Sequence, residues 1–103
     1  MKVEMTFNDA TIIASGYQKE DIYYTIKSAF TKRGLICSSD NEILSFEDTG
    51  NEHDYAHMWN VIMSLLKSEW FISCATSFTF FDDDESEEDI LSQAWKVHRN
   101  IER

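Results

Sequence analysis

Residues 70–81 read WFISCATSFTFF and residues 82–89 read DDDESEED, so twelve uncharged residues lead straight into a run with seven acids. Aromatic and β-branched residues are typical of strands, which favours an extended conformation over a buried helix for the first run. Side chains alternate along a strand, so one face carries larger apolar groups than the other. The face that we expect on the core consists of Trp70, Ile72, Cys74, Thr76, Phe78 and Phe80. The sequence therefore predicts a central strand over 70–81.

The composition is that of one folded domain. The chain has 103 residues, of which 43% are hydrophobic, and this length suits one core rather than two. We therefore predict a single globular domain over residues 1–103. The two cysteines, Cys37 and Cys74, lack the spacing of a metal site, so we expect free thiols in a reducing, cytoplasmic environment. The first residues lack the apolar segment of a signal peptide, and no uncharged stretch reaches the ~18 residues of a membrane helix, so we expect no membrane association.

The beginning of the chain predicts a half-buried strand. Val3, Met5 and Phe7 alternate with more polar residues, as on a strand with one face on a core. Beyond Asn8, residues 11–13 either continue this strand past a bulge or form a second strand after a tight turn. We prefer the single bent strand.

Apolar residues at helical spacing, together with capping signals, predict three helices. Ser15 and Gln18 have the spacing of a capping box, and Gly34 is suited to a left-handed helix end. Thr49 and Glu52 repeat the capping spacing before the second helix. The predicted helices span about 17–33, 52–68 and 86–101, and a predicted hairpin joins 35–37 to 42–46.

The predicted order is β-α-β-β-α-β with a C-terminal helix. The first six elements match the ferredoxin-like, or split β-α-β, plan of an antiparallel sheet with helices, which is an α+β fold. Such folds support many unrelated functions, so the expected architecture alone assigns none.

The acidic residues are unevenly distributed along the chain. The formal net charge is −10, and residues 34–95 hold fourteen acids but a single base, Lys67. Clustered bases are what phosphate contacts require, so this distribution argues against direct nucleic-acid binding. It points instead to a basic partner or to an acidic surface that only keeps the protein soluble.

The expected topology brings two acidic loops together. In the split plan the third and fourth strands run in the same direction, so the loops that follow them meet at one edge of the sheet. Seven acids in eight residues exceed what helix capping needs. The ten acids expected to contact a partner are Glu47, Asp48, Glu52, Asp54, Asp82, Asp83, Asp84, Glu85, Glu87 and Glu88. We therefore expect a small acidic protein that binds a basic protein or a nucleic-acid-binding protein. Inhibitors, immunity proteins and nucleic-acid mimics bind basic partners through acidic surfaces of this kind.

Two other functions remain open. His53 and His57 are four residues apart at the start of a predicted helix, a spacing at which two imidazoles can bind one metal ion. Phe71 and Phe81 end the less apolar face of the 70–81 strand, so the chain could also be a structural module that pairs with a second copy. No G-x-S-x-G elbow, HExxH motif or glycine-rich phosphate loop is present, so we expect neither an enzyme nor a cofactor.

Overall fold

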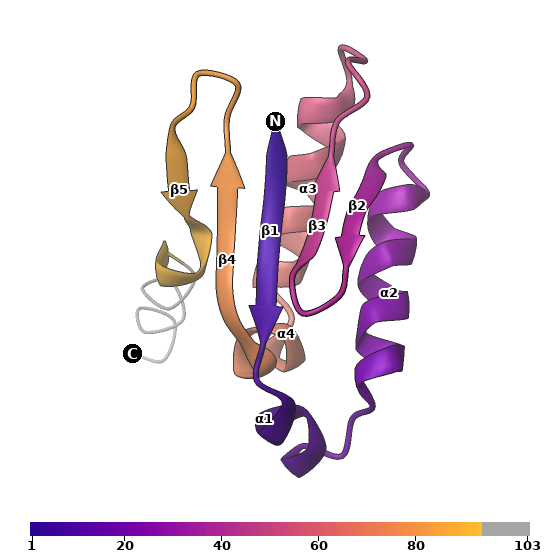
Figure 1. The fold of residues 1–103 in the computed structure, drawn as a ribbon, viewed down its shortest axis with the longest axis vertical. Coiled ribbons are helices and arrows are strands. Elements are labelled where there is room, and N and C mark those ends of the chain that lie inside the picture. The colour runs from indigo at the N-terminus through magenta and orange to yellow at the C-terminus, as the bar shows by residue number, and fades with distance from the viewer. Residues whose placement is uncertain (94–103) are drawn as a thin grey trace.

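The computed structural model describes residues 1–93 of the chain. These residues contain five strands and four helices. After the first strand, two helices, two strands, two helices and two strands follow one another (Figure 1). They are β1 (Lys2–Phe7), α1 (Asp9–Ala14), α2 (Lys19–Thr31), β2 (Ile36–Asp40), β3 (Leu44–Glu47), α3 (Asp54–Leu66), α4 (Glu69–Cys74), β4 (Ala75–Phe81) and β5 (Glu87–Asp89). The fold is α+β, as the sequence predicts.

The five strands form one antiparallel sheet. Their order is β2-β3-β1-β4-β5, and every neighbouring pair is antiparallel. In Figure 1, α3 runs behind the sheet and α2 runs along its β2 side. Lys2 at the start of β1 lies opposite Glu47 on one side and Phe81 on the other. This register places the ends of β3 and β4 beside the beginning of β1.

One face of the sheet and the two long helices form the core. Val3 of β1 pairs with Phe46 of β3 and Phe80 of β4, and all three side chains are buried. Phe30 of α2 stacks on Phe46 with ring centroids 4.2 Å apart. Helix α3 adds Met58 and other residues at helical spacing, which are fully buried. Burial of such side chains, at about 1.5–3 kcal/mol each, is what holds α2 and α3 to the sheet.

The strand predicted over 70–81 is present only in its second half. Residues 69–74 form the short helix α4, which buries Phe71 and leaves Trp70 half-exposed. The carbonyl of Cys74 accepts a hydrogen bond of 2.9 Å from the amide of Asn8, which ties α4 to the end of β1. A helical turn reverses the chain between α3 and β4 and puts Phe71 in the core, and this packing outweighs the β-propensity of the residues. The remaining strand, β4, lies inside the sheet between β1 and β5, as predicted.

Neither alternative for residues 8–14 is correct. After β1 these residues form the helix α1, whose first turn is capped by the side-chain oxygen of Asn8 at 3.1 Å from the amide of Thr11. Ile12 is buried while Ile13 is 75% exposed, a pattern that a single helical turn produces. Asn at an N-cap satisfies a free N–H group, so Asn8 starts a helix here rather than a turn between strands.

The two long helices lie where the sequence predicts them, with shorter ends. Gly34 follows α2 with φ of +84°, the left-handed conformation that the sequence predicts for it. Ser15 ends α1 instead of capping α2, which begins after Gln18 without a side-chain cap. The hairpin turn lies at residues 41–43 rather than 38–41, because β2 extends as far as Asp40.

The helix predicted over 86–101 begins later. Residues 87–89 instead form β5, which pairs with β4. Residues 90–93 are helical, and the rest of the predicted helix lies outside the described residues. Asp89 accepts hydrogen bonds from the amide and the hydroxyl of Ser92, so the helical cap is at Asp89, three residues after the predicted start of the helix.

Candidate binding surface

The loops after β3 and β4 lie on either side of the first residue. The amino group of Met1 donates a hydrogen bond of 2.9 Å to Asp48 in the first loop and a second one to Asp83 in the other loop. Figure 1 shows the N-terminus between these loops, at the same end of the sheet. We call the surface formed by residues 47–54 and 82–89 the acidic edge.

One acid of the acidic edge has a structural role. Asp54 is 3% exposed and begins α3. One of its carboxylate oxygens accepts hydrogen bonds from the amide of Thr49 at 2.7 Å, the hydroxyl of Thr49 at 2.8 Å and the amide of Asn51 at 3.2 Å. These bonds, first of all those from Thr49, lower the pKa of Asp54. Asp54 therefore closes the loop rather than facing a partner.

Two further acids shape the turn between β4 and β5. Asp84 accepts hydrogen bonds from the amide of Ser86 at 3.0 Å and from its hydroxyl at 2.6 Å, which lower the pKa of Asp84. Asp82 accepts from the amide of Asp83 at 2.7 Å. Glu85 has φ of +68°, a backbone conformation that residues other than glycine rarely adopt. This turn is therefore built by its own acids, as Asx turns are.

The other acids of the edge differ in whether they have a partner within the described residues. Within residues 1–93, the side chains of Glu47, Glu85 and Glu87 make no hydrogen bond or ion pair, and all three are exposed. Glu52 lies 3.5 Å from the exposed imidazole of His53. Glu88 accepts a hydrogen bond of 2.6 Å from the side chain of Gln93. The local bonds thus occupy some of the predicted contact residues and leave a smaller set of free carboxylates.

His53 and His57 lie together at the start of α3, as their spacing predicts. Their ring centroids are 6.3 Å apart. In the described part of the chain, no three His, Cys, Asp or Glu side chains are grouped so that they could hold a metal ion. The Nδ1 atom of His57 is buried and has no hydrogen-bond partner there. The pair alone therefore does not define a metal site.

The two cysteines are free thiols in different settings. Cys37 is half-buried in β2, while Cys74 is buried at the end of α4. Burial raises the pKa of both thiols, so they are less reactive than an ordinary cysteine. They have the character of packed side chains.

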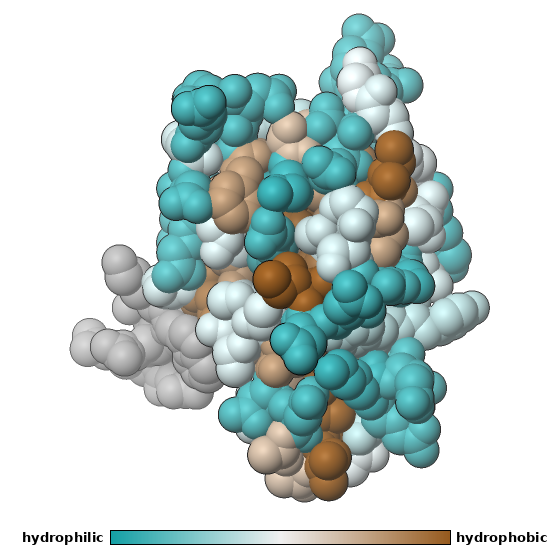
Figure 2. Space-filling view, in the orientation of Figure 1, coloured by the Kyte–Doolittle hydropathy of each residue, from teal (hydrophilic) through white to brown (hydrophobic). Residues whose placement is uncertain are grey.

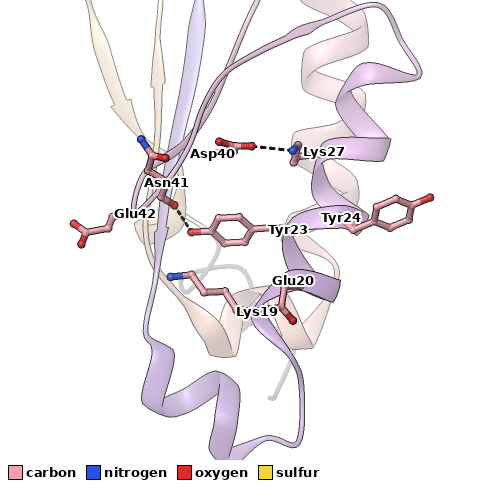
Figure 3. A pocket seen from close by; sticks show the side chains of 8 residues that line it. All are labelled: Lys19, Glu20, Tyr23, Tyr24, Lys27, Asp40, Asn41 and Glu42. Atoms are coloured by element: carbon pink, nitrogen blue, oxygen red, sulfur yellow. Dashed lines mark hydrogen bonds and ion pairs between the residues drawn. The ribbon is translucent and has the colours of Figure 1, made fainter.

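Sequence reasoning missed a groove beside the β2–β3 turn. It has a volume of about 550 Å³ and lies between α2 and this turn (Figure 3). The Tyr23 hydroxyl points across it and donates to the carbonyl of Asn41 at 2.9 Å, while Lys27 binds Asp40 at 2.9 Å. Tyr24 points away from these residues in Figure 3. Two pairs of polar groups in the groove thus bind each other, while Lys19 pairs with Asp9 outside the lining. Among the described residues, the free groups that remain include the carboxylates of Glu20 and Glu42, which do not converge on one point in Figure 3.

The face of the sheet turned away from α3 is mainly hydrophilic. Figure 2 shows this face with apolar residues as separate small patches. Its hydroxyl groups bind one another, since Thr6 lies 2.7 Å from Thr76 and 2.6 Å from Ser77, and Ser38 lies 2.6 Å from Ser45. The described residues give this face no large apolar patch with which to pair a second copy.

No helix in the described residues is both long and apolar enough to cross a membrane. No protein-family model, curated protein or solved structure matches the chain.

Proposed function

We propose that this chain is a small, non-enzymatic binding protein that engages a basic partner protein through the acidic edge. The observation that supports this most is the contact of one amino group with both Asp48 and Asp83, because it joins two acidic loops that lie far apart in the sequence. The partner would be a basic protein, including one whose basic groove binds nucleic acid. Closely spaced carboxylates imitate the phosphate charge that such a groove recognises.

The distribution of ion pairs supports this proposal. Lys19 pairs with Asp9 at 3.3 Å and Lys27 with Asp40 at 2.9 Å, both outside the acidic edge. At the edge itself, Lys2 lies opposite Glu47 in the sheet, but its ion pair, at 2.9 Å, is with Glu4. Free carboxylates of one sign raise the association rate with a basic surface, and the effect weakens as salt rises. Structural roles account for Asp54, Asp82 and Asp84, but not for Glu47, Glu85 and Glu87.

We propose further that β1, α2, β2, β3, α3 and β4 form a ferredoxin-like core, to which α1, α4 and β5 are added. In the split plan, each β-α-β unit has a strand of the other unit between its own two strands. The position of β3 between β2 and β1, and of β1 between β3 and β4, supports this assignment. The free thiols Cys37 and Cys74 support a cytoplasmic location, because reducing compartments maintain thiols.

The test compares two variants with the same net charge. The edge variant carries Glu47→Gln, Glu85→Gln and Glu87→Gln. The control variant removes three exposed acids elsewhere, with Glu20→Gln, Glu42→Gln and Glu69→Gln. Proteins captured at low salt by the original chain are identified, purified and titrated against all three proteins by calorimetry. We expect the edge variant to bind at least about tenfold more weakly, since each close charge pair can contribute 1.5 kcal/mol or more.

The control variant decides the interpretation. If it binds the purified partner like the original chain, the position of the charges determines binding. If both variants lose binding equally, only net charge matters, and the proposed edge is wrong. Unchanged binding by the edge variant would also contradict it. Thermal melts of both variants verify that they are folded.

A further inference from the structure

A second groove runs between the two long helices. Residues of α2 spaced one turn apart face residues of α3 with the same spacing, and the space between them is about 400 Å³. It is lined by Thr25, Ala29, Lys32, Arg33, Val61, Ser64, Leu65, Ser68 and Trp70. Val61 and Leu65 are buried, so the groove has an apolar floor, and its length follows the helices.

The groove continues past Trp70 into an adjoining hollow. This hollow has a volume of about 220 Å³ and shares Thr25 and Trp70 with the first. Its other lining residues are Ile22, which is buried, Tyr17, which is 45% exposed, and the acidic Asp21, so this end of the groove suits the apolar part of a ligand rather than an anionic group. Most of this surface is aliphatic or aromatic. An apolar chain could therefore lie along Trp70 from one hollow into the next.

One end of the groove carries cations without acidic partners. Among residues 1–93, Lys2, Lys19 and Lys27 each pair with a carboxylate. Within the same residues Lys67 makes no such pair, but it does not line the groove. Lys32 and Arg33, which do line the groove, also make no such pair there, although the chain has a net charge of −10. They follow the C-terminal end of α2, where the helix dipole favours positive charge. That dipole explains why cations stand there, but it leaves their hydrogen-bond donors free.

We propose that this groove binds a small amphipathic anion, a carboxylate attached to an apolar chain or ring. The carboxylate would lie between Lys32 and Arg33, and the apolar body would lie against Val61, Leu65 and Trp70. A volume of about 400 Å³ is within the usual range for small-molecule sites. Apolar lining with a few charged groups at one end is also typical of such sites. The site is independent of the acidic edge.

Octanoate and octanol, which have the same chain length and differ in charge, are the probes. Each is titrated into the isotope-labelled protein below its aggregation limit, and backbone and indole shifts are followed by NMR. We expect octanoate to cause saturable shifts concentrated at Thr25, Val61, Leu65 and Trp70. Octanol should bind the same residues more weakly, because it gains nothing from the cations. Shifts confined to other parts of the chain, or no saturation, would overturn the proposal.

Variants separate charge from cavity. Lys32→Gln with Arg33→Gln should weaken the binding of octanoate by about three- to tenfold, as expected for exposed charge pairs. The same variant should weaken the binding of octanol by less than about twofold. The control, Lys19→Gln with Lys27→Gln, removes the same charge from the groove beside the β2–β3 turn. It should change the affinity for neither octanoate nor octanol. Equal weakening by both pairs would show a net-charge effect only, which contradicts the proposal.

A filling variant tests the groove without the cations. Ser64 is exposed on α3 and lines the groove, so Ser64→Phe should fold normally and occupy the space for the apolar body. It should abolish the binding of both probes while Lys32 and Arg33 remain. Binding of octanoate to a folded Ser64→Phe protein at the original affinity would place the site elsewhere and overturn the proposal.

Discussion

Asp48 and Asp83 accept hydrogen bonds from one and the same amino group, that of Met1. The two aspartates follow different strands, β3 and β4, which both pair with β1. That both aspartates reach the amino group of Met1 follows from the register of the sheet, because Lys2 is opposite the last residues of both strands. Repulsion between the loops is reduced where a positive group stands between them.

This contact predicts the titration of the amino group. Its pKa is raised above the ordinary 8.0, mainly by the hydrogen bond to Asp83 and then by that to Asp48. A group with a raised pKa stabilises the fold below its ordinary pKa, and this stabilisation is lost as the pH rises through the raised value. In the 103-residue chain, Asp48→Asn with Asp83→Asn should return the pKa toward 8.0. The rate of acylation of the amino group against pH measures it.

The same variant should also lose less stability than the original chain above pH 8, because its amino group titrates alike in the folded and unfolded states. Glu87→Gln, in the same acidic edge but without contact to Met1, serves as the control and should keep the raised pKa. An ordinary pKa in the original chain would contradict the contact itself.

Phe71 and Trp70 distinguish the helix α4 from the strand that the sequence predicts. The strand would put Trp70 in the core, whereas the structure buries Phe71 completely. Phe71 also packs edge-on against Phe7 and Phe78, with ring centroids 5.8 and 4.9 Å away. We expect Phe71→Ala to cost about 3–5 kcal/mol of unfolding free energy and Trp70→Ala about 1 kcal/mol, measured by urea unfolding. The reverse order would support the strand.

Phe71→Ala removes a large part of the stability of a domain of this size and could leave the protein unfolded. The milder Phe71→Leu keeps the comparison measurable in that case. It should still destabilise the fold more than Trp70→Leu does, because only Phe71 is enclosed on all sides.

Sequence patterns predict the elements that depend on local rules. The helices α2 and α3 have apolar residues at helical spacing over several turns, and Gly34 has the conformation expected of a helix end. The short helices α1 and α4 depend instead on what they pack against. Residues 9–14 and 69–74 contain β-branched and aromatic residues, yet both form helices. Each is a short helix of six residues that reverses the chain, and only the surrounding core shows which side chains must be buried.

The acidic edge was predictable in outline but not in detail. The meeting of two loops depends on strand direction alone, which the order of elements provides. The role of each carboxylate depends on loop geometry instead. Asp54 and Glu52 are two residues apart and chemically alike, but only Asp54 turns inward to bind Thr49 and Asn51. No spacing rule separates these roles, because both residues lie at the start of one helix.

Asp54 predicts how the stability changes with acid. Its pKa is lowered from the ordinary 3.8, first of all by the hydrogen bond from the amide of Thr49. A lowered pKa means that the carboxylate stabilises the fold above its ordinary pKa and that this is lost as the pH falls through the lowered value. Asp54→Ala should therefore lower Tm at neutral pH by about 5 °C or more, and should reduce the fall of Tm below pH 4.

The control for Asp54 is Glu52→Gln, a change in the same loop at a side chain that accepts no hydrogen bond from the loop backbone. It should leave both Tm and its acid dependence almost unchanged. If Asp54→Ala and the original chain lost stability in parallel on acidification, the carboxylate of Asp54 would not be bound as the structure shows.

Glu85 stores backbone strain in the turn between β4 and β5. Its φ is +68°, and its amide donates a hydrogen bond of 3.1 Å to the carbonyl of Asp82, so the turn holds it in this conformation. A residue with a Cβ atom costs roughly 1–2 kcal/mol in the left-handed region, and glycine avoids that cost but loses more chain entropy. We expect Glu85→Gly to be more stable than Glu85→Ala by about 1 kcal/mol in urea unfolding. Both variants lose the same charge, so a basic partner should bind them equally. Equal stabilities would show that the turn relaxes and releases the positive φ, and the bonds of Asp84 to Ser86 would then be lost as well.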